Sequence, residues 1–381
     1  MRLFYAAGSR PNSALAHSDI WRINLYRGLV QLGLEVLEFD FDLTPHYQHS
    51  SRERRESAEF IRTRRPVLES ELLNQLARAH AACPVDVFFS YFYADIVQPS
   101  TILRIKDMGI TTVNWYCNAS YQFDLVRHLA PAFDYCLVPE RFRLADYRRA
   151  GARPVYCQEA ADPSFYRPHD EKLVYDITFV GAAYGDRPDY VRLLLQSDLN
   201  TRVWGPGWRD LTPARSTALR LRRGMGRCKR RVLGRELYPS RQPSPPKLPA
   251  SVCGGILTDG AVVRTFSKSK INLGFSSVGD TARTREPIRQ VRLRDFEVPM
   301  SGGFYMLEYV DEIEDFFVPG EEIVCFSGEE DLVEKARYYL DHDDERETIR
   351  AAGHRRARRD HTWQKRLSNA FAEMDLRASD E

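Results

Sequence analysis

The sequence predicts an α/β protein made of two doubly wound parallel-sheet domains. Short apolar segments, typical of buried strands, alternate with amphipathic helical segments along most of the chain. The alternation is interrupted at residues 159–168, where prolines occur without hydrophobic periodicity. The length of 381 residues suits two hydrophobic cores better than one. These three observations together predict two domains joined by a hinge.

The N-terminal series opens with an apolar strand at 2–7 and a helix at 14–32 that Gly33 ends. Later elements follow from the same periodicities. They are strands at 35–41, 85–89, 111–116, 133–138 and 155–157, and helices at 69–82, 102–108 and 141–150. We therefore expect a first domain at 1–160 and a hinge at 161–172.

The second series runs from 173 to 355. It comprises strands at 175–180, 201–204, 271–275, 304–307 and 323–326, and helices at 190–196, 262–269, 289–300 and 311–317. Gly302 and Gly303 supply a stop for the helix at 289–300. A helical region follows residue 329, and its tail at 356–381 is expected to pack on the first domain.

Composition excludes several classes of protein. The chain is 43% hydrophobic and 12% aromatic, as folded soluble proteins are, and no apolar run approaches the ~20 residues that span a bilayer. The N-terminus lacks the features of a secretory signal, so we expect a cytoplasmic protein. Seven cysteines occur without a C-x-x-C pair, which predicts neither a disulfide framework nor a zinc site.

Residues 209–250 depart from the α/β pattern and are strongly basic. They hold twelve Lys and Arg against two acidic residues, a local net charge of +10. Interleaved leucines allow an amphipathic helix on an anionic membrane surface, at the inner membrane face. A phosphorylated or anionic acceptor, a nucleic acid, or no partner at all are the alternatives.

Several segments together predict a phosphate and sugar site. Glycine loops at 181–187 and 205–208 let backbone N–H groups approach a diphosphate, and Ser276 follows a strand. Arg289 and Arg294 supply cations, and Glu297 can accept the hydroxyls of a sugar. In the first domain, Gly8, Ser9 and Arg10 follow the first strand and form a second candidate site.

The sequence resembles the CgeB-like, spore-maturation-type group of GT-B glycosyltransferases. The resemblance rests on DITFVGAAYGDR (176–187), VWGPGW (203–208), FSKSKINLGF (266–275), RDFEVPMSGGF (294–304), DFFVPGEEIVCFSGEEDL (315–332) and RAAGHRRARRDHTWQKR (350–366). It implies a GT-B fold and transfer of a sugar from a nucleotide donor to an acceptor hydroxyl. No cofactor is implied beyond the nucleotide sugar itself.

The resemblance also implies roles for single residues. Glu297 is expected at the donor ribose, and Arg187 and Arg294 at the diphosphate, with Arg294 stabilising the leaving group. The further donor-binding candidates are Gly181, Tyr184, Gly205, Gly207, Trp208, Lys270, Ser276 and Arg289. Arg289 stands where many retaining relatives carry a second glutamate, so that motif does not assign a retaining reaction.

The acceptor site and the base are less defined. Asn118 joins the glycine turn at 8–10 as an acceptor-binding candidate, and Asp124 and His17 are rival candidates for the base that deprotonates an acceptor hydroxyl. The resemblance implies no metal ion, although Asp40 and Asp42 form a D-x-D pattern. An epimerase, a non-catalytic sugar-nucleotide or polyanion-binding protein and a nucleic-acid-modifying glycosyltransferase are the rival functions.

Overall fold

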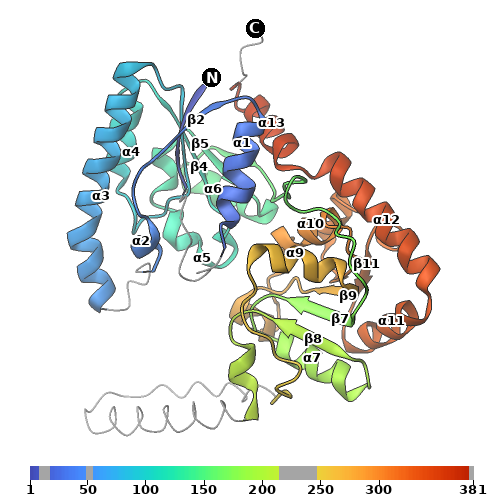
Figure 1. Ribbon diagram of the computed structural model, residues 1–381. Helices are drawn as coiled ribbons and strands as arrows, with labels where there is room; N and C mark the ends of the chain where they lie inside the picture. The colour runs from blue at the N-terminus through green and yellow to red at the C-terminus, as the bar shows by residue number, and fades with distance from the viewer. Residues whose placement is uncertain (8–17, 49–54, 214–246, 377–381) are drawn as a thin grey trace, which may run out of the picture. The chain divides into compact units, whose positions relative to one another are not determined.

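The computed structural model describes residues 1–7, 18–48, 55–213 and 247–376 (Figure 1). The chain forms two compact units. The first consists of Met1–Arg167, Gln290–Met300 and Arg355–Glu381, and the second of Pro168–Arg289 and Ser301–His354. Each unit holds one parallel sheet with helices around it, which confirms the predicted fold class.

The sheet of the first unit has six parallel strands in the order β2-β1-β3-β4-β5-β6. Most residues of the four central strands are buried, as expected for a sheet covered on both faces, whereas the strand β2 at one side of the sheet is partly exposed. The strands are β1 (Arg2–Ala6), β2 (Glu35–Glu38), β3 (Val87–Ser90), β4 (Thr111–Trp115), β5 (Tyr135–Val138) and β6 (Pro154–Tyr156).

The helices of the first unit include elements from both ends of the chain (Figure 1). The helix α13 (Trp363–Glu373) packs against α1 (Arg27–Gln31), and its apolar face joins the core of the N-terminal sheet. The others are α2 (Thr44–Gln48), α3 (Arg55–Ala82), α4 (Pro99–Lys106), α5 (Ala119–Val126), α6 (Leu144–Arg149) and α10 (Leu293–Met300).

The sheet of the second unit has five parallel strands in the order β11-β10-β9-β7-β8. The strands are β7 (Tyr175–Val180), β8 (Thr201–Trp204), β9 (Ser269–Gly274), β10 (Tyr305–Glu308) and β11 (Val324–Phe326). The helices α7 (Arg187–Gln196) and α11 (Glu329–Asp341) contact each other, and α9 (Asp259–Ser267) contacts β9. The helix α12 (Asp343–Asp360) follows α11.

Two elements that differ from the sequence prediction are α10 and α3. The predicted helix at 289–300 begins only at Leu293, because Arg289 forms an extended bridge with Ser277. The contacts of Gln290–Met300 group this segment with the first unit, whereas the sequence placed it inside a domain at 173–355. The helix α3 starts fourteen residues before the predicted helix at 69–82, since its polar N-terminal half shows no clear apolar stripe.

Membrane-spanning helices and clusters of metal ligands are both absent from the described residues. No helix there is long and apolar enough to cross a membrane. No group of three or more His, Cys, Asp or Glu in those same ranges is arranged to hold a metal ion. The described cysteines are all free thiols.

Candidate functional site

The second sheet contains a topological switch point between β7 and β9. The chain leaves β7 for β8 on one side and then crosses to β9 on the other. In open parallel sheets, ligands bind at the carboxyl ends of the strands where the connections diverge in this way. The candidate site is therefore the edge formed by the segments that follow β7, β8, β9 and β10.

The loops after β7 and β8 are fastened to each other by backbone and indole hydrogen bonds. Gly181 N donates to Trp204 O at 2.8 Å, and the Trp208 indole Nε1 donates to Gly181 O at 2.7 Å. Gly205 has φ +133°, and a Cβ built there would lie 2.2 Å from Gly181 O. Glycine is thus required at 205, and the predicted glycines and Trp208 shape this edge of the sheet.

Arg187 begins α7 and is buried among aromatic rings. Its guanidinium lies 3.8 Å from the ring centroid of Tyr184 and 5.1 Å from that of Phe179, and it donates to Ala182 O at 3.1 Å. The residue is only 5% exposed. These contacts brace the loop after β7, and the expected contact of Arg187 with a diphosphate stays a prediction.

Glu308 ends β10 with a buried carboxylate that the sequence analysis missed. Ser276 N and Ser277 N donate to its Oε2 at 2.9 and 3.1 Å. The hydroxyl of Ser276 also donates to Oε2, at 3.1 Å, and that of Ser277 to Oε1, at 3.0 Å. A charged residue ending an otherwise apolar parallel strand was the available signal.

Arg289 places a partly exposed cation beside the end of β9. Its Nε lies 3.5 Å from Glu308 Oε1, and its side chain is 48% exposed. The bridge between Arg289 and Ser277 fixes its backbone beside the end of β9. Burial and the nearby Glu308 raise the pKa of the neighbouring Tyr190 phenol to about 12. The site therefore combines a partly exposed guanidinium with a buried carboxylate that already accepts from the nearby serine hydroxyl and backbone N–H groups.

Arg294 and Glu297 lie on α10 in the first unit. The Arg294 Nη1 and Glu297 Oε2 atoms form an ion pair at 2.6 Å. Glu297 is 1% exposed, and the negative charge of this carboxylate helps burial to raise the pKa of the Tyr166 phenol. The predicted contact of Glu297 with the donor ribose and that of Arg294 with the leaving group stay predictions.

The predicted acceptor residues fall into two groups. Gly8, Ser9, Arg10 and His17 lie outside the described residues. Asn118 Nδ2 donates to the Tyr91 hydroxyl at 2.9 Å, and Asn118 Oδ1 accepts from the Tyr121 hydroxyl at 3.2 Å. The Asp124 carboxylate is 87% exposed and pairs with Arg127 at 3.1 Å.

Two further buried carboxyl groups of the first unit were also missed. Glu140 follows β5, and Glu159 follows β6. Burial raises the pKa of Glu140 to about 7, and burial with the charges of Glu140 and Glu297 raises that of Glu159 to about 8. Neither residue belongs to a recognisable motif, so only the strand ends that precede them could have drawn attention to them.

Lys270 does not reach the candidate edge. It is the second residue of β9 and pairs with Asp176 near the start of β7, at 3.1 Å. Both residues lie at the amino ends of their strands, so the length of β9 separates Lys270 from Ser276. Proximity in sequence to the site did not imply proximity in space. Most of the basic segment at 209–250 lies outside the described residues.

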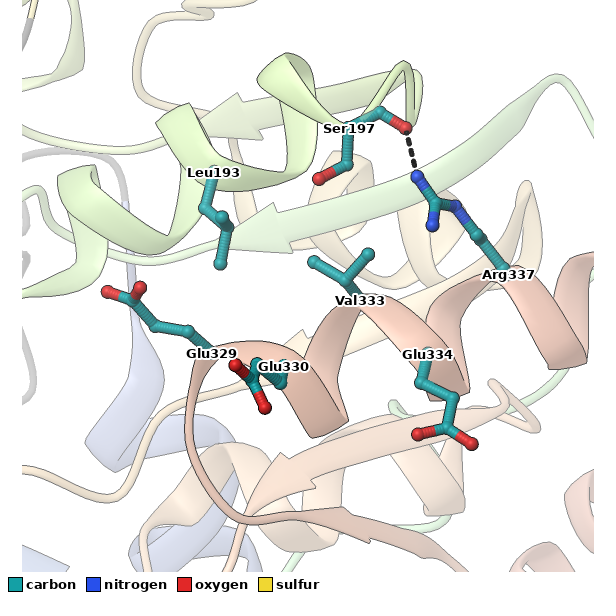
Figure 2. A pocket seen from close by; sticks show the side chains of 7 residues that line it. All are labelled: Leu193, Ser197, Glu329, Glu330, Val333, Glu334 and Arg337. Carbon is teal, nitrogen blue, oxygen red and sulfur yellow. Dashed lines mark hydrogen bonds between the residues drawn. The ribbon is translucent and has the colours of Figure 1, made fainter.

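A surface groove of about 480 Å³ lies between α7 and α11 (Figure 2). Leu193 of α7 and Val333 of α11 point toward each other in it, and Glu329, Glu330 and Glu334 of α11 also line it. Its one cation among the lining residues, Arg337, donates to Ser197 O at 3.1 Å. This acidic lining is unsuited to a diphosphate, which favours the strand edge as the candidate site.

Comparison with known proteins identifies a related family. Residues 187–372 match the family described as "Glycosyl transferase-like". This segment includes Arg187 at its start, Trp208, Arg289 and Glu308. A search of curated protein sequences gives no match.

Several solved structures are similar to this chain along nearly its whole length, at low sequence identity. Sucrose-phosphate synthase from Thermosynechococcus elongatus is 13% identical, with 98% of both chains covered and a TM-score of 0.58. HepE from Anabaena, solved with UDP-glucose, is 9% identical over 98% of this chain and 99% of its own, with a TM-score of 0.56. AviGT4, from avilamycin A biosynthesis, is 15% identical over 99% and 96%, with a TM-score of 0.52.

Proposed function

We propose that this chain, a glycosyltransferase by its family segment at 187–372 and by its two-sheet fold, moves a sugar from a nucleoside diphosphate to an acceptor hydroxyl. One observation carries the proposal: the half-exposed Arg289 guanidinium stands at the switch-point edge of the second sheet. A cation at the carboxyl ends of parallel strands suits a diphosphate. The UDP-glucose bound to HepE makes a uridine nucleotide the first donor to test.

The transfer breaks the bond between the anomeric carbon and the terminal diphosphate oxygen, and the electron pair leaves with that oxygen. The acceptor oxygen forms the new bond to carbon and gives its proton to a base, for which Asp124 and His17 are the proposed candidates. Arg289 and Arg294 are proposed to stabilise the developing negative charge without a metal ion. Glu297 is proposed to hold the donor ribose.

The basic segment at 209–250 bears on which acceptor the protein uses. The net charge of +10 at 209–250 supports an anionic or lipid-linked acceptor, held near a negatively charged membrane surface. A nucleic-acid acceptor is the alternative that the same charge supports. Binding to nucleic acid that falls steeply with salt and is lost on deletion of 209–250 would favour that alternative.

A thermal-shift panel of UDP, GDP, dTDP, CDP and ADP tests the donor site. We expect one nucleotide to raise the melting temperature of the wild-type protein and to lose most of this effect with Arg289→Ala. The matched control is Arg192→Ala, which removes an exposed arginine of α7 that pairs only locally with Asp189. If no nucleotide shifts the wild-type protein, the proposed donor site is wrong.

A further inference from the structure

The end of β9 forms an anion-binding turn that an internal carboxylate already occupies. Successive backbone N–H groups that converge on one point make a nest for a negatively charged atom. At Ser276 and Ser277 both N–H groups donate to the same atom, Glu308 Oε2. Because this nest is filled from within the protein, a phosphate cannot use it while Glu308 stays in place.

The Glu308 carboxylate also forms an ion pair with Arg289. Oε1 of Glu308 accepts from the Ser277 hydroxyl at 3.0 Å and lies 3.5 Å from Arg289 Nε. Glu308 is 3% exposed, whereas nearly half of the Arg289 side chain is accessible. The Arg289 Nε is therefore paired with a buried carboxylate, and nearly half of the Arg289 side chain stays open to a ligand.

We propose that Glu308 is a positioning residue of the donor site, which fills the Ser276–Ser277 nest and orients Arg289 so that the guanidinium binds the donor diphosphate. This inference rests on the proposed function. An arginine held in one orientation loses less side-chain entropy when it binds phosphate, which strengthens the contact. The loop after β9 is held by the same carboxylate, so loop and cation are positioned together.

The direction in which Glu308→Gln changes the affinity for UDP distinguishes positioning from a simple charge effect. A carboxylate near a diphosphate repels it, so a residue acting only through its charge would weaken UDP binding, and Glu308→Gln would tighten it. Positioning predicts the opposite. Glutamine keeps one oxygen for the two N–H groups but cannot form the ion pair with Arg289. We expect UDP to bind about tenfold more weakly to Glu308→Gln, the scale of one charged hydrogen bond.

The experiment is a double-mutant cycle on UDP binding, measured by titration calorimetry. The four proteins are the wild type, Arg289→Ala, Glu308→Gln and the double variant. If Glu308 acts through Arg289, then Glu308→Gln has no further effect on the dissociation constant in the Arg289→Ala background. Glu334→Gln, which removes an exposed carboxylate of α11, is the matched control and should bind UDP as the wild type does.

Ser277→Ala is a less disruptive variant that tests the same proposal if Glu308→Gln does not fold. Ser277→Ala removes one hydroxyl bond to Glu308 and leaves both N–H groups of the nest, so a smaller weakening in the same direction is expected. Additive effects in the cycle, or tighter binding by Glu308→Gln, would overturn the positioning role while leaving the donor site intact. If the wild-type protein binds neither UDP nor another nucleoside diphosphate, the proposed function and this inference both fail.

Discussion

Glu159 shows how a single residue couples the stability of the first unit to pH. In the folded protein the pKa of its carboxyl group is raised from the usual 4.5 to about 8. Burial is the main cause, and the negative charges of Glu140 and Glu297 add to it. Between these two pH values the folded chain binds more protons than the unfolded chain. The stabilisation is therefore complete below about pH 4.5 and is lost as pH rises toward 8.

We predict that Glu159→Gln flattens this dependence. Each such group makes the free energy of unfolding fall by about 1.4 kcal/mol per pH unit across its window. Urea titrations at several pH values between 5 and 8 measure the slope. Glu140, whose pKa is raised to about 7, leaves a residual slope in the variant. An unchanged slope in Glu159→Gln would contradict the assignment, and the exposed Glu334→Gln is the control.

At the residue scale, the sequence predicted the glycine loops and Arg289 but not Glu308. Glycines and arginines stand out because few other residues can serve a tight turn or a phosphate. The role of Glu308 depends on the two serines, 32 and 31 residues earlier in the chain, that bind it across neighbouring strands. Such pairing follows from strand order, and single-residue reasoning does not supply strand order. Lys270 lies at the opposite end of β9 from Ser276, and its contact with the donor stays a prediction.

At the element scale, α13 completes the core of the first unit. Trp363 is fully buried, and its ring packs edge-on against Trp115 of β4, with centroids 5.6 Å apart. Gly28 of α1 lies beneath it, where an added Cβ would sit 2.8 Å from Trp363 Cβ. The close approach of α1 and α13 therefore depends on the absence of a side chain at Gly28.

We predict that Trp363→Ala lowers the free energy of unfolding by about 3–5 kcal/mol, the usual cost of removing a buried Trp. Trp363→Phe is the matched variant. The buried indole Nε1 has no hydrogen-bond partner among the described residues, so phenylalanine loses packing but no hydrogen bond. Urea unfolding followed by circular dichroism compares the two. Equal and small effects of both substitutions would contradict a core role for α13.

Most strands were predictable as elements, because a buried parallel strand is a short apolar run with a turn after it. The N-terminal end of the helix at 289–300 was not. Arg289 and Gln290 continue the polar spacing of a helix in the sequence, but the backbone of Arg289 pairs with Ser277. A contact between segments decided that boundary, and local propensity carries no information about it.

At the scale of the whole molecule, the two units do not correspond to two contiguous stretches of chain. The segment Gln290–Met300 belongs to the first unit, although the residues before and after it belong to the second. Phe296 of this segment is fully buried, and its ring lies 5.3 Å from that of His361 and 5.6 Å from the Arg366 guanidinium. All three residues are part of the first unit.

We predict that a fragment of residues 168–354 exposes the apolar face of α10. It lacks His361, Arg366 and the N-terminal sheet, so Phe296, Val298 and Met300 lose their burial. We expect it to bind a hydrophobic dye strongly and to self-associate during gel filtration. The matched fragment replaces residues 290–300 with a glycine-serine linker of equal length and should bind less dye. Equal dye binding by the two fragments would contradict the grouping.

The membership of the first unit has a consequence for synthesis on the ribosome. Its sheet is made first, yet the surface that receives Trp363 stays open until the last part of the chain has been translated. About 190 residues separate Arg167 from Arg355, which takes on the order of 10–40 s at ordinary elongation rates. During that interval the nascent chain carries an unfinished apolar surface around Trp115. The unit whose sheet is translated first is thus the one completed last. A chaperone would matter most at the apolar surface around Trp115.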